Sequence, residues 1–341
     1  MVFEGEVRGH GGERGTEATE SSPQRPTDRP TIGLVLGGGG ARGFSHIGVI
    51  RTLLAHGIEP DIIVGTSIGA VVGGCQAAGF LDVLADWSLG LTKRGMLSYL
   101  DISLQGGGLI AGGKLVARLE EYLGATHIEA LPIRFAAVTT EVGTGHEIWL
   151  TRGRLVDAMR ASYALPGIFP PVLLDNRWLV DGALVNPVPV SAARVLGARM
   201  VIAVNLSSDI LGRSVTISGE NEAPPIIPQQ ERGGGFRRIF GAEQALKRQF
   251  ASSHIRRPGI PTVMVDAFNI MQDRITRARL AGDPPDVIIN PRLGQVGWFD
   301  FHQAQQAIDV GARATERALE EIDEVIAALT PRPAPVTPAV R

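Results

Sequence analysis

Short apolar runs alternate with longer segments in which apolar residues recur every three or four positions. The short runs predict buried strands, and the longer segments predict helices with one apolar face. Strands are expected near 31–36, 61–64, 133–139, 199–205 and 286–289. Helices are expected near 43–56, 68–79, 113–123, 189–196 and 263–280. This alternation predicts an α/β fold, a three-layer sandwich with helices on both faces of a mainly parallel central sheet.

Four segments depart from this alternation. Residues 302–329 carry apolar positions among charges and predict one long packed helix. Residues 1–30 combine Gly, Pro, Ser, Thr and charges, which predicts a disordered tail, and 330–341 form a proline-rich tail. Residues 209–260 contain Pro-Pro and Gly-Gly-Gly among many basic residues, and are expected to form a mobile insertion.

Length and composition fit one large domain. A chain of 341 residues with 44% hydrophobic content can bury a substantial core. We expect this domain to span 31–329, with a motif core at 32–194 and a C-terminal extension at 195–329. The net charge of −2 gives no reason to expect nucleic acid as a partner. The single cysteine, Cys75, excludes an intramolecular disulfide and is expected to be a small buried residue.

The sequence also bears on location. Residues 1–30 lack the apolar stretch of a signal peptide, and no run of 18 apolar residues occurs, so we expect no transmembrane helix and a cytoplasmic protein. Within the insertion, Phe236, Ile239 and Phe240 recur at helical spacing beside basic residues. This pattern suggests transient membrane-surface contact through 236–250, peripheral to the bilayer. Packing of these side chains onto the core, or a surface loop with incidental charges, remains an alternative.

The pentapeptide GTSIG at 65–69 lies between the apolar run at 61–64 and a helical segment. This order of strand, G-x-S-x-G and helix is typical of a nucleophile elbow. Gly65 and Gly69 would let the strand and helix approach closely, and Ser67 would stand at a helix N-terminus, which favours developing negative charge. A Gly-Ser turn that ends a strand is common in α/β proteins, so the interpretation depends on context.

A glycine-rich loop, GGGGARG at 37–43, joins the first predicted strand to its helix. Such a loop presents backbone N–H groups to a phosphate or to the oxyanion of an acyl transfer. Gly38-x-Gly40-x-x-Gly43 also matches the dinucleotide fingerprint, so a Rossmann oxidoreductase is a rival interpretation. That fold needs an acidic residue at the end of the second strand. Ser67 occupies that region instead, which favours the hydrolase.

A serine nucleophile needs a base, and none of the seven histidines stands out. His46 and His56 lie on the first predicted helix, where a solvated or core-satisfied histidine is the simpler account. His302 comes late in the chain, as in an α/β-hydrolase, but is interpreted as a helix-start residue packed under aromatics.

Asp181, in the segment WLVDGALVNP at 178–187, is a stronger candidate for the base than any histidine. Asp-Gly between apolar runs is also a strong hairpin signal, so a plain turn remains an alternative for this segment taken alone. A carboxylate with an ordinary pKa of about 3.9 is a poor base toward a hydroxyl, unless burial raises its pKa or the hydroxyl is acidified by the helix and glycine loop. A Ser–Asp dyad is therefore chemically feasible.

Together these blocks resemble the patatin-like phospholipase family. The blocks that carry the resemblance stand in family order: GGGARG at 38–43, GTSIG at 65–69 and DGA at 181–183, with ASYALPGIFPP at 161–171 between the last two. Residues 286–291 and 299–302 are similar to the bacterial single-domain branch, which resembles the catalytic domain of neuropathy target esterase.

The resemblance implies roles for particular residues. Ser67 would be the nucleophile and Asp181 the base, without metal or cofactor. Gly38, Gly39 and Gly40 would supply the oxyanion donors. The supporting positions would be Arg42, Gly43, Gly65, Gly69, Gly182 and Asn186. Arg42 would steady the loop or meet a lipid phosphate.

The expected activity is that of a carboxylic ester hydrolase of the phospholipase A or lysophospholipase type. It would cleave fatty-acyl esters of phospholipids or lysophospholipids through an acyl-enzyme, with a lipid ester as its partner. A thioesterase or a general carboxylesterase is a close variant. A catalytically quiet member of the same fold that binds lipid or protein is the alternative from a different class.

Overall fold

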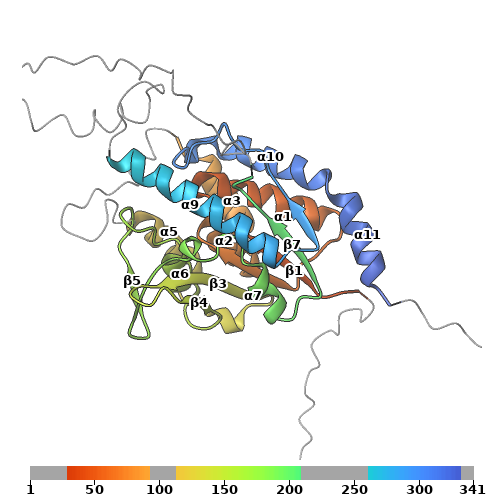
Figure 1. The fold of residues 1–341 in the computed structure, drawn as a ribbon, viewed down its shortest axis with the longest axis horizontal. Coiled ribbons are helices and arrows are strands. Elements are labelled where there is room, and N and C mark those ends of the chain that lie inside the picture. Colours follow the sequence, from red (N-terminus) through yellow and green to blue (C-terminus); the bar gives the residue numbers. More distant parts are fainter. Residues whose placement is uncertain (1–28, 93–112, 209–259, 332–341) are drawn as a thin grey trace, which may run out of the picture.

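The computed structural model of the protein describes residues 29–92, 113–208 and 260–331. These residues form one eight-stranded sheet with helices on both faces (Figure 1). The predicted three-layer α/β fold is therefore confirmed. The hypotheses on the N-terminal tail up to residue 28, on residues 209–259 with their membrane-contact segment, and on the tail beyond residue 331 lie outside the described residues.

Every predicted strand is present. The strands are β1 (Ile32–Leu36), β2 (Ile62–Thr66), β3 (Arg134–Glu141), β4 (Glu147–Leu150), β5 (Val172–Leu174), β6 (Arg177–Asp181), β7 (Met200–Val204) and β8 (Val287–Ile289). The hydrogen-bonded order is β5-β6-β3-β2-β1-β7-β8, and β4 is a further partner of β3. The pairs β3–β2, β2–β1, β1–β7 and β7–β8 are parallel, while β4, β5 and β6 join antiparallel. The sheet is thus mainly parallel, with an antiparallel part that the hydrophobic pattern did not predict.

The predicted helices are also present. The α-helices are α1 (Ser45–Ala55), α2 (Ile68–Ala77), α3 (Leu81–Leu89), α5 (Gly113–Leu123), α6 (Leu155–Ser162), α7 (Val190–Val195), α9 (Ile260–Gly282), α10 (Ala304–Glu316) and α11 (Leu319–Leu329). Short 3-10 turns are η1 (Gly40–Phe44), η2 (Ile128–Ala130), η3 (Gly182–Leu184) and η4 (Phe301–Gln303). Within the described ranges, no helix has both the length and the apolar character needed to cross a bilayer.

The prediction of one long helix over 302–329 is wrong, because this segment forms α10 and α11. The Thr315 hydroxyl donates to the Gly311 carbonyl at 3.0 Å, and the Ala318 N–H donates to the Thr315 carbonyl at 2.8 Å. This tightened turn ends α10 and changes the direction of the chain. As a result α10 packs on α1, whereas α11 packs on β7 and β8 with Ile322 fully buried.

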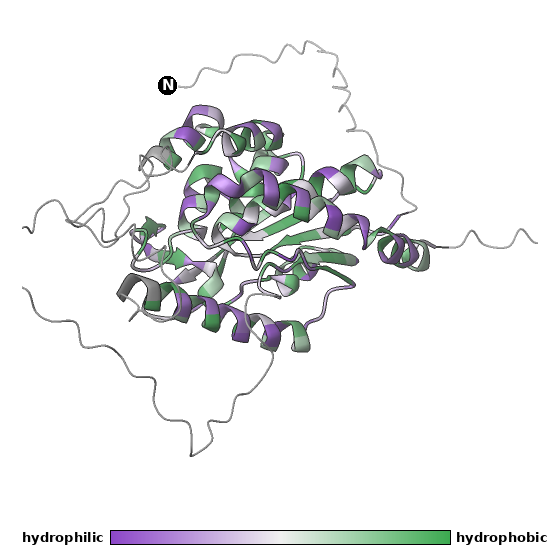
Figure 2. Cartoon of the chain, turned by 90° about the horizontal axis from the view of Figure 1, so that it is seen from above, coloured by the Kyte–Doolittle hydropathy of each residue, from purple (hydrophilic) through white to green (hydrophobic). Residues whose placement is uncertain are grey.

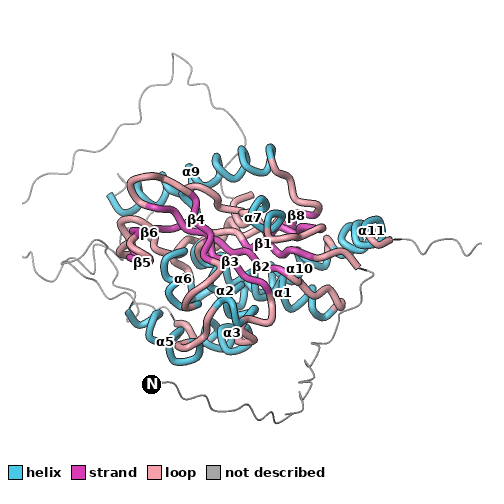
Figure 3. Tube along the Cα trace, turned by 90° about the horizontal axis from the view of Figure 1, so that it is seen from below, coloured by secondary structure: helices cyan, strands magenta, loops and turns pink. Residues whose placement is uncertain are grey.

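Alternate residues of the central strands face two separate hydrophobic clusters. On β1, Leu34 and Leu36 join the cluster under α1, α2 and α10, while Val35 joins the cluster under α7. Figure 3 shows α7 and α9 on one side of the strands and α1, α2 and α3 on the other. In Figure 2 the strands are mostly green and the helices carry purple outer positions, as a buried parallel sheet requires.

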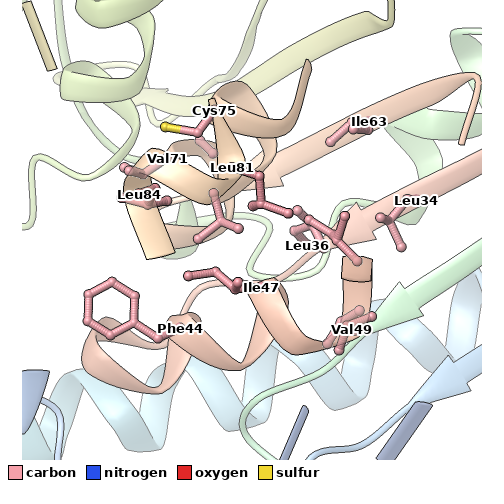
Figure 4. Packing of buried hydrophobic residues seen from close by; sticks show 14 of the residues in the cluster. Leu34, Leu36, Phe44, Ile47, Val49, Ile63, Val71, Cys75, Leu81 and Leu84 are labelled. Atoms are coloured by element: carbon pink, nitrogen blue, oxygen red, sulfur yellow. The ribbon is translucent and has the colours of Figure 1, made fainter. Parts of the chain in front are cut away.

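Cys75 lies in the larger cluster, beside Val71 and Leu84 (Figure 4). Its side chain is 3% exposed, and burial raises the pKa of the thiol to about 12. The thiol is therefore protonated and packs as a small apolar group, which confirms the prediction for this residue.

The described chain begins with an ion pair between Arg29 and Asp61. The guanidinium of Arg29 donates to both carboxylate oxygens of Asp61, at 2.7 and 2.8 Å, and Asp61 also accepts the N–H of Ile32 at 2.9 Å. These contacts join the start of β1 to the start of β2.

Helices α1 and α10 cross at a pair of glycines. A Cβ added to Gly48 would lie 2.0 Å from the Ile308 carbonyl oxygen, and one added to Gly311 would lie 2.0 Å from the Ser45 carbonyl oxygen. Real Cβ atoms do not approach backbone oxygens this closely. The two helices can therefore pack at their observed separation only while both positions remain glycine.

Gly48→Ala or Gly311→Ala is expected to destabilise the protein by about 1–3 kcal/mol or more, because the added methyl overpacks a rigid contact. This loss should exceed the gain of about 1 kcal/mol that Ala brings to a helix. Urea unfolding would measure it. Gly282→Ala is the matched control, since no atom lies within 4 Å of its added Cβ. Equal stability of Gly48→Ala and Gly282→Ala would contradict this account of the crossing.

Candidate active site

Two strands occupy one edge of β3 end to end. β2 pairs with the first part of β3, where Thr66 lies opposite Val138. β4 pairs with residues 137–140 of β3 and so takes the other edge. β6 pairs with residues 139–141 of β3, and Asp181 lies opposite Thr139. Residues 139 and 140 of β3 therefore pair with β4 and β6 at the same time. Because a strand has only two edges, β6 lies on the edge that β2 has left, and Asp181 follows directly beyond Thr66.

The sharp turn at Ser67 joins β2 to α2 and has the geometry of an elbow. Ser67 has φ 58° and ψ −126°, a strained conformation for a residue with a side chain, at a cost of about 1–3 kcal/mol. A Cβ added to Gly65 would lie 2.4 Å from the Ala70 nitrogen, and one added to Gly69 would lie 2.1 Å from the Leu36 carbonyl oxygen. Glycine at both positions therefore allows the strand and the helix to meet at this angle.

Ser67 and Asp181 form a buried hydrogen-bonded pair. The Ser67 hydroxyl donates to Oδ2 of Asp181 at 2.7 Å, and the Ala183 N–H donates to Oδ1 at 2.9 Å. Asp181 is fully buried, and this burial raises the pKa of its carboxyl to about 7, although the bonds from Ala183 and Ser67 lower it in part. A carboxylate with a pKa near neutrality is a far better proton acceptor than one with an ordinary pKa.

The segment after Asp181 is held by side chains around it. The amide nitrogen of Asn186 donates to Glu147 at 2.8 Å, and the Thr66 hydroxyl donates to the Asn186 carbonyl at 2.9 Å. A Cβ added to Gly182 would lie 2.3 Å from the Val138 carbonyl oxygen. Asn186 and Gly182 therefore hold the segment after Asp181 against β2 and β3.

The glycine-rich loop lies against Ser67. A Cβ added to Gly38 would lie 3.4 Å from the Cβ of Ser67. The Gly38 N–H donates to the Pro187 carbonyl at 3.0 Å, which differs from its expected use as an oxyanion donor. The N–H groups of Gly39 and Gly40 make no hydrogen bond to another described residue outside their own turn. The loop therefore brings backbone donors next to Ser67, but the Gly38 N–H is already engaged.

Two further glycines set the course of this loop. Gly40 has φ 59°, in the left-handed region that favours glycine, and an added Cβ would lie 2.6 Å from the Trp298 carbonyl oxygen. A Cβ added to Gly43 would lie 2.2 Å from Cγ2 of Ile68, the residue after Ser67. The loop and the elbow thus pack directly on each other.

Buried polar side chains brace the loop from behind. The guanidinium of Arg42 is buried, donates through Nε to the Val296 carbonyl at 2.9 Å, and lies 6.0 Å from the Trp298 ring centre. Nε2 of His46 donates to the Gly37 carbonyl at 2.8 Å, and burial lowers the pKa of this imidazole to about 4. These contacts support a loop-steadying role for Arg42. The lowered pKa of His46 favours its neutral form, which bonds to the loop through Nε2, while Nδ1 has no partner among the described residues.

Ser162 is a site residue that sequence reasoning did not identify. Its buried hydroxyl accepts the Ser67 N–H at 2.9 Å and donates to the Val138 carbonyl at 2.6 Å. It therefore ties the strained elbow to β3. The segment ASYALPG was noted for its resemblance to known sequences, yet a serine at the end of α6 carries no local signal of such a role.

Gln272 of α9 was also missed. Its side chain is 2% exposed, and Nε2 lies 3.0 Å from the Cβ position of Gly38, with no hydrogen-bond partner among the described residues. Helix α9 was predicted, but its sequence does not reveal that this face covers the glycine loop.

An apolar cluster adjoins the pair through Ala183, whose N–H donates to Asp181. Its buried members are Leu165, Ile168, Ala183, Phe268 and Trp298. The rings of Phe268 and Trp298 meet edge to face at 5.5 Å, which joins α9 to the chain before η4. Ser67 is only 5% exposed. The Ser67–Asp181 pair is therefore buried, with apolar side chains beside it.

No histidine among the described residues hydrogen-bonds to Ser67 or Asp181. His302 lies in η4 with Nδ1 4.0 Å from Asp300, next to Phe301, which agrees with its interpretation as a helix-start residue near aromatics. Among the residues that the structure describes, no group of three or more His, Cys, Asp or Glu side chains is arranged to hold a metal.

Asp181→Asn is expected to raise the free energy of unfolding above about pH 7. In the parent, the pKa of Asp181 rises from 3.8 to about 7 on folding, so its contribution to stability is full below pH 3.8 and is lost as pH rises to about 7. Each pKa unit corresponds to about 1.4 kcal/mol. Denaturant unfolding from pH 3 to 9 would measure the difference between the variant and the parent.

This difference should grow between about pH 4 and 7 and then level off. His46 acts oppositely, since its lowered pKa favours the folded state above pH 6.5 and this contribution is lost toward pH 4. Because His46 is present in both proteins, its effect cancels in the comparison. A difference that does not change with pH would contradict the raised pKa of Asp181.

Ser162→Ala is expected to cost about 1–3 kcal/mol of stability, because the buried Ser67 N–H loses its acceptor. If Ser67 is a nucleophile, the elbow should also be misplaced, slowing its labelling by a fluorophosphonate on the order of tenfold to a hundredfold. Ser88→Ala is the control, since Ser88 is equally buried but its hydroxyl only donates to the Ala85 carbonyl. Labelling at the parent rate in a stable Ser162→Ala protein would exclude this positioning role.

Known proteins resemble this chain over the segment that contains these site residues. A model of the family described as patatin-like phospholipase matches residues 34–194, which include the elbow, the glycine loop and Asp181. Lysophospholipase NTE1 of Scheffersomyces stipitis is 35% identical over 52% of this chain and 12% of its own length. The crystal structure of VipD from Legionella pneumophila aligns with a TM-score of 0.43 and 13% identity, covering 86% of this chain and 67% of that one.

The most extensive of these similarities runs beyond the motif core into the C-terminal extension. An uncharacterized NTE family protein of Mycobacterium tuberculosis is 33% identical, over 88% of this chain and 95% of its own length. The buried Ser–Asp pair and the glycine loop thus lie in a chain that matches such a relative almost end to end, and the chain belongs to the NTE family of patatin-like phospholipases.

Proposed function

We propose that the protein is a serine hydrolase that cleaves fatty-acyl esters of phospholipids or lysophospholipids through an acyl-enzyme on Ser67. The observation that carries this proposal is the 2.7 Å hydrogen bond from Ser67 to a buried Asp181 whose pKa lies near neutrality. Membership of the family supports a lipid-ester hydrolase in general, and one relative is named a lysophospholipase.

In the first half of the reaction, the Ser67 oxygen attacks the acyl carbonyl carbon while Asp181 takes the hydroxyl proton. The carbonyl oxygen becomes an oxyanion, which the N–H groups of Gly39 and Gly40 stabilise together with the N-terminus of α2. The Gly38 N–H holds the loop through Pro187 instead. Collapse of this intermediate breaks the ester bond, and protonated Asp181 returns its proton to the leaving alcohol oxygen.

In the second half, a water molecule takes the place of the alcohol. Asp181, again ionised, accepts a proton as the water oxygen attacks the acyl-enzyme carbonyl. The second intermediate uses the same backbone donors, and its collapse releases the fatty acid and restores the Ser67 hydroxyl. The dyad itself thus serves both steps and needs no metal.

The surroundings of the dyad suit a lipid. The cluster of Leu165, Ile168, Phe268 and Trp298 offers apolar contacts to an acyl chain, and apolar burial favours binding at about 25 cal/mol per Å². Since Ser67 is 5% exposed, some of the residues around it must move before a substrate reaches the hydroxyl. The same burial favours one alternative, a quiet member of the family that binds lipid without turnover.

Purified protein should react with a fluorophosphonate and release fatty acid from lysophospholipid, and both activities should vanish in Ser67→Ala. Asp181→Asn should lose nearly all turnover, because the proton acceptor is gone. In the parent, kcat/KM should rise with pH through about 7 and then level off, because Asp181 must be ionised to accept the proton.

Ser88→Ala serves as the control, since this buried serine of α3 should keep full turnover. Turnover that survives Ser67→Ala would refute the assignment of the nucleophile. A folded parent with neither labelling nor turnover, tested with and without phospholipid vesicles, would favour the quiet lipid-binding member.

A further inference from the structure

A polar cavity of about 580 Å³ lies against α9, the helix whose Gln272 packs on the glycine loop. It opens where β7 and β8 end, between Asn205 and Asn290, and its other wall is α9. Open parallel sheets bind ligands at the carboxyl ends of their strands. The mechanism proposed above does not use this cavity.

The lining of the cavity favours an anion. Arg277 and Arg292 outweigh the one carboxylate, Asp273, which is buried and paired with Nε of Arg277 at 2.8 Å. Arg292 is exposed and forms no ion pair with another described residue. The cavity therefore carries one positive charge that its own carboxylate does not neutralise.

Hydrogen-bond donors add to this charge. Thr276 is 2% exposed, lines the cavity, and its hydroxyl has no partner among the described residues. Oδ1 of Asn205 accepts the Ser207 N–H at 3.0 Å, which leaves the amide NH2 of Asn205 as its donor group. A buried hydroxyl without a partner is costly unless a ligand or water satisfies it. Guanidinium, hydroxyl and amide donors together form a set suited to phosphate oxygens.

Helix α9 links this cavity to the nucleophile. Gln272 precedes Thr276 by four residues, so the two side chains lie on one helix face, about 6 Å apart along the axis. The unpartnered Nε2 of Gln272 is 3.0 Å from the Cβ position of Gly38, and that position is 3.4 Å from the Ser67 Cβ. Donor groups of α9 thus lie both next to the glycine loop, at Gln272, and in the cavity, at Thr276.

We propose that this cavity binds the phosphate of a glycerophospholipid headgroup, with Arg292 and Thr276 on the phosphate and Gln272 on the glycerol oxygens. The inference rests on the proposed function of Ser67, and it makes the substrate a phosphoglyceride ester rather than a neutral acylglycerol. It also separates phosphate recognition from Arg42, whose guanidinium is buried on the Val296 carbonyl.

The kinetic test compares a lysophospholipid with a monoacylglycerol of the same acyl chain. Arg292→Gln and Thr276→Val should each raise KM for the lysophospholipid, by on the order of tenfold to a hundredfold for the arginine. KM for the monoacylglycerol should stay within about twofold, because it has no phosphate. Arg313→Gln, which replaces an exposed arginine on α10, is the matched control and should change neither substrate. Equal effects of Arg292→Gln on both substrates, or none on either, would overturn the proposal.

A binding test separates this inference from the catalytic one. Calorimetry with the Ser67→Ala protein should show that glycerol 3-phosphate binds, and that Arg292→Gln added to it weakens binding by at least tenfold. Such binding would support the cavity even if the parent hydrolysed no ester. If the parent cleaves esters but the Ser67→Ala protein does not bind glycerol 3-phosphate, the phosphate-binding role of the cavity is refuted and the catalytic proposal is not. Inorganic phosphate that binds as tightly as glycerol 3-phosphate, with no preference for the lysophospholipid, would indicate an ion site and overturn the headgroup assignment.

Discussion

The site depends on the way β2 and β6 divide one edge of β3. β2 leaves this edge at Thr66, and β6 takes it up at Asp181, so the backbone ladder itself brings the serine and the aspartate together. Their separation is set by strand register rather than by the reach of long side chains. A short serine and a short aspartate are sufficient for this reason, and each is held by an element that cannot shift without breaking sheet hydrogen bonds. Groups fixed in this way need little reorganisation when charge develops between them.

Two features of this arrangement lower the stability of the folded protein. Asp181 is buried where ionisation is unfavourable, and Ser67 adopts a strained backbone conformation. Both features oppose folding, yet burial also raises the proton affinity of the carboxyl, and the Ser67 hydroxyl donates to that carboxyl. The surrounding contacts offset these terms, notably the double role of the Ser162 hydroxyl and the packing of glycines against backbone oxygens. Active sites commonly combine local strain with a rigid surrounding structure of this kind.

Much of this could be predicted from sequence, and the remainder has physical reasons. β1, β2 and β7 are buried on both faces, so their residues form continuous apolar runs. β4, β5 and β6 include half-exposed residues and the exposed Trp178, and the hairpin turn falls at Asp175 and Asn176 rather than at Asp181. Ser67 and Asp181 could be paired from the sequence because their motifs are local, and the structure places them within hydrogen-bond distance. Ser162 and Gln272 were missed because a helical serine or glutamine becomes important only through contacts made by distant strands. The break after Thr315 has no Gly or Pro to mark it.

The contacts of Arg42 have a consequence for the order in which the protein acquires its site. The glycine loop belongs to the first part of the chain, but the carbonyls that hold it, those of Val296 and Trp298, lie more than two hundred residues later. During synthesis the N-terminal part of a chain emerges first and begins to fold before the rest exists. Ser67 is therefore on the ribosome-bound chain long before the glycine loop beside it can be braced. In a nascent molecule this serine stands in an unfinished setting, which is completed only once the segment around Val296 and Trp298 has been made and docked.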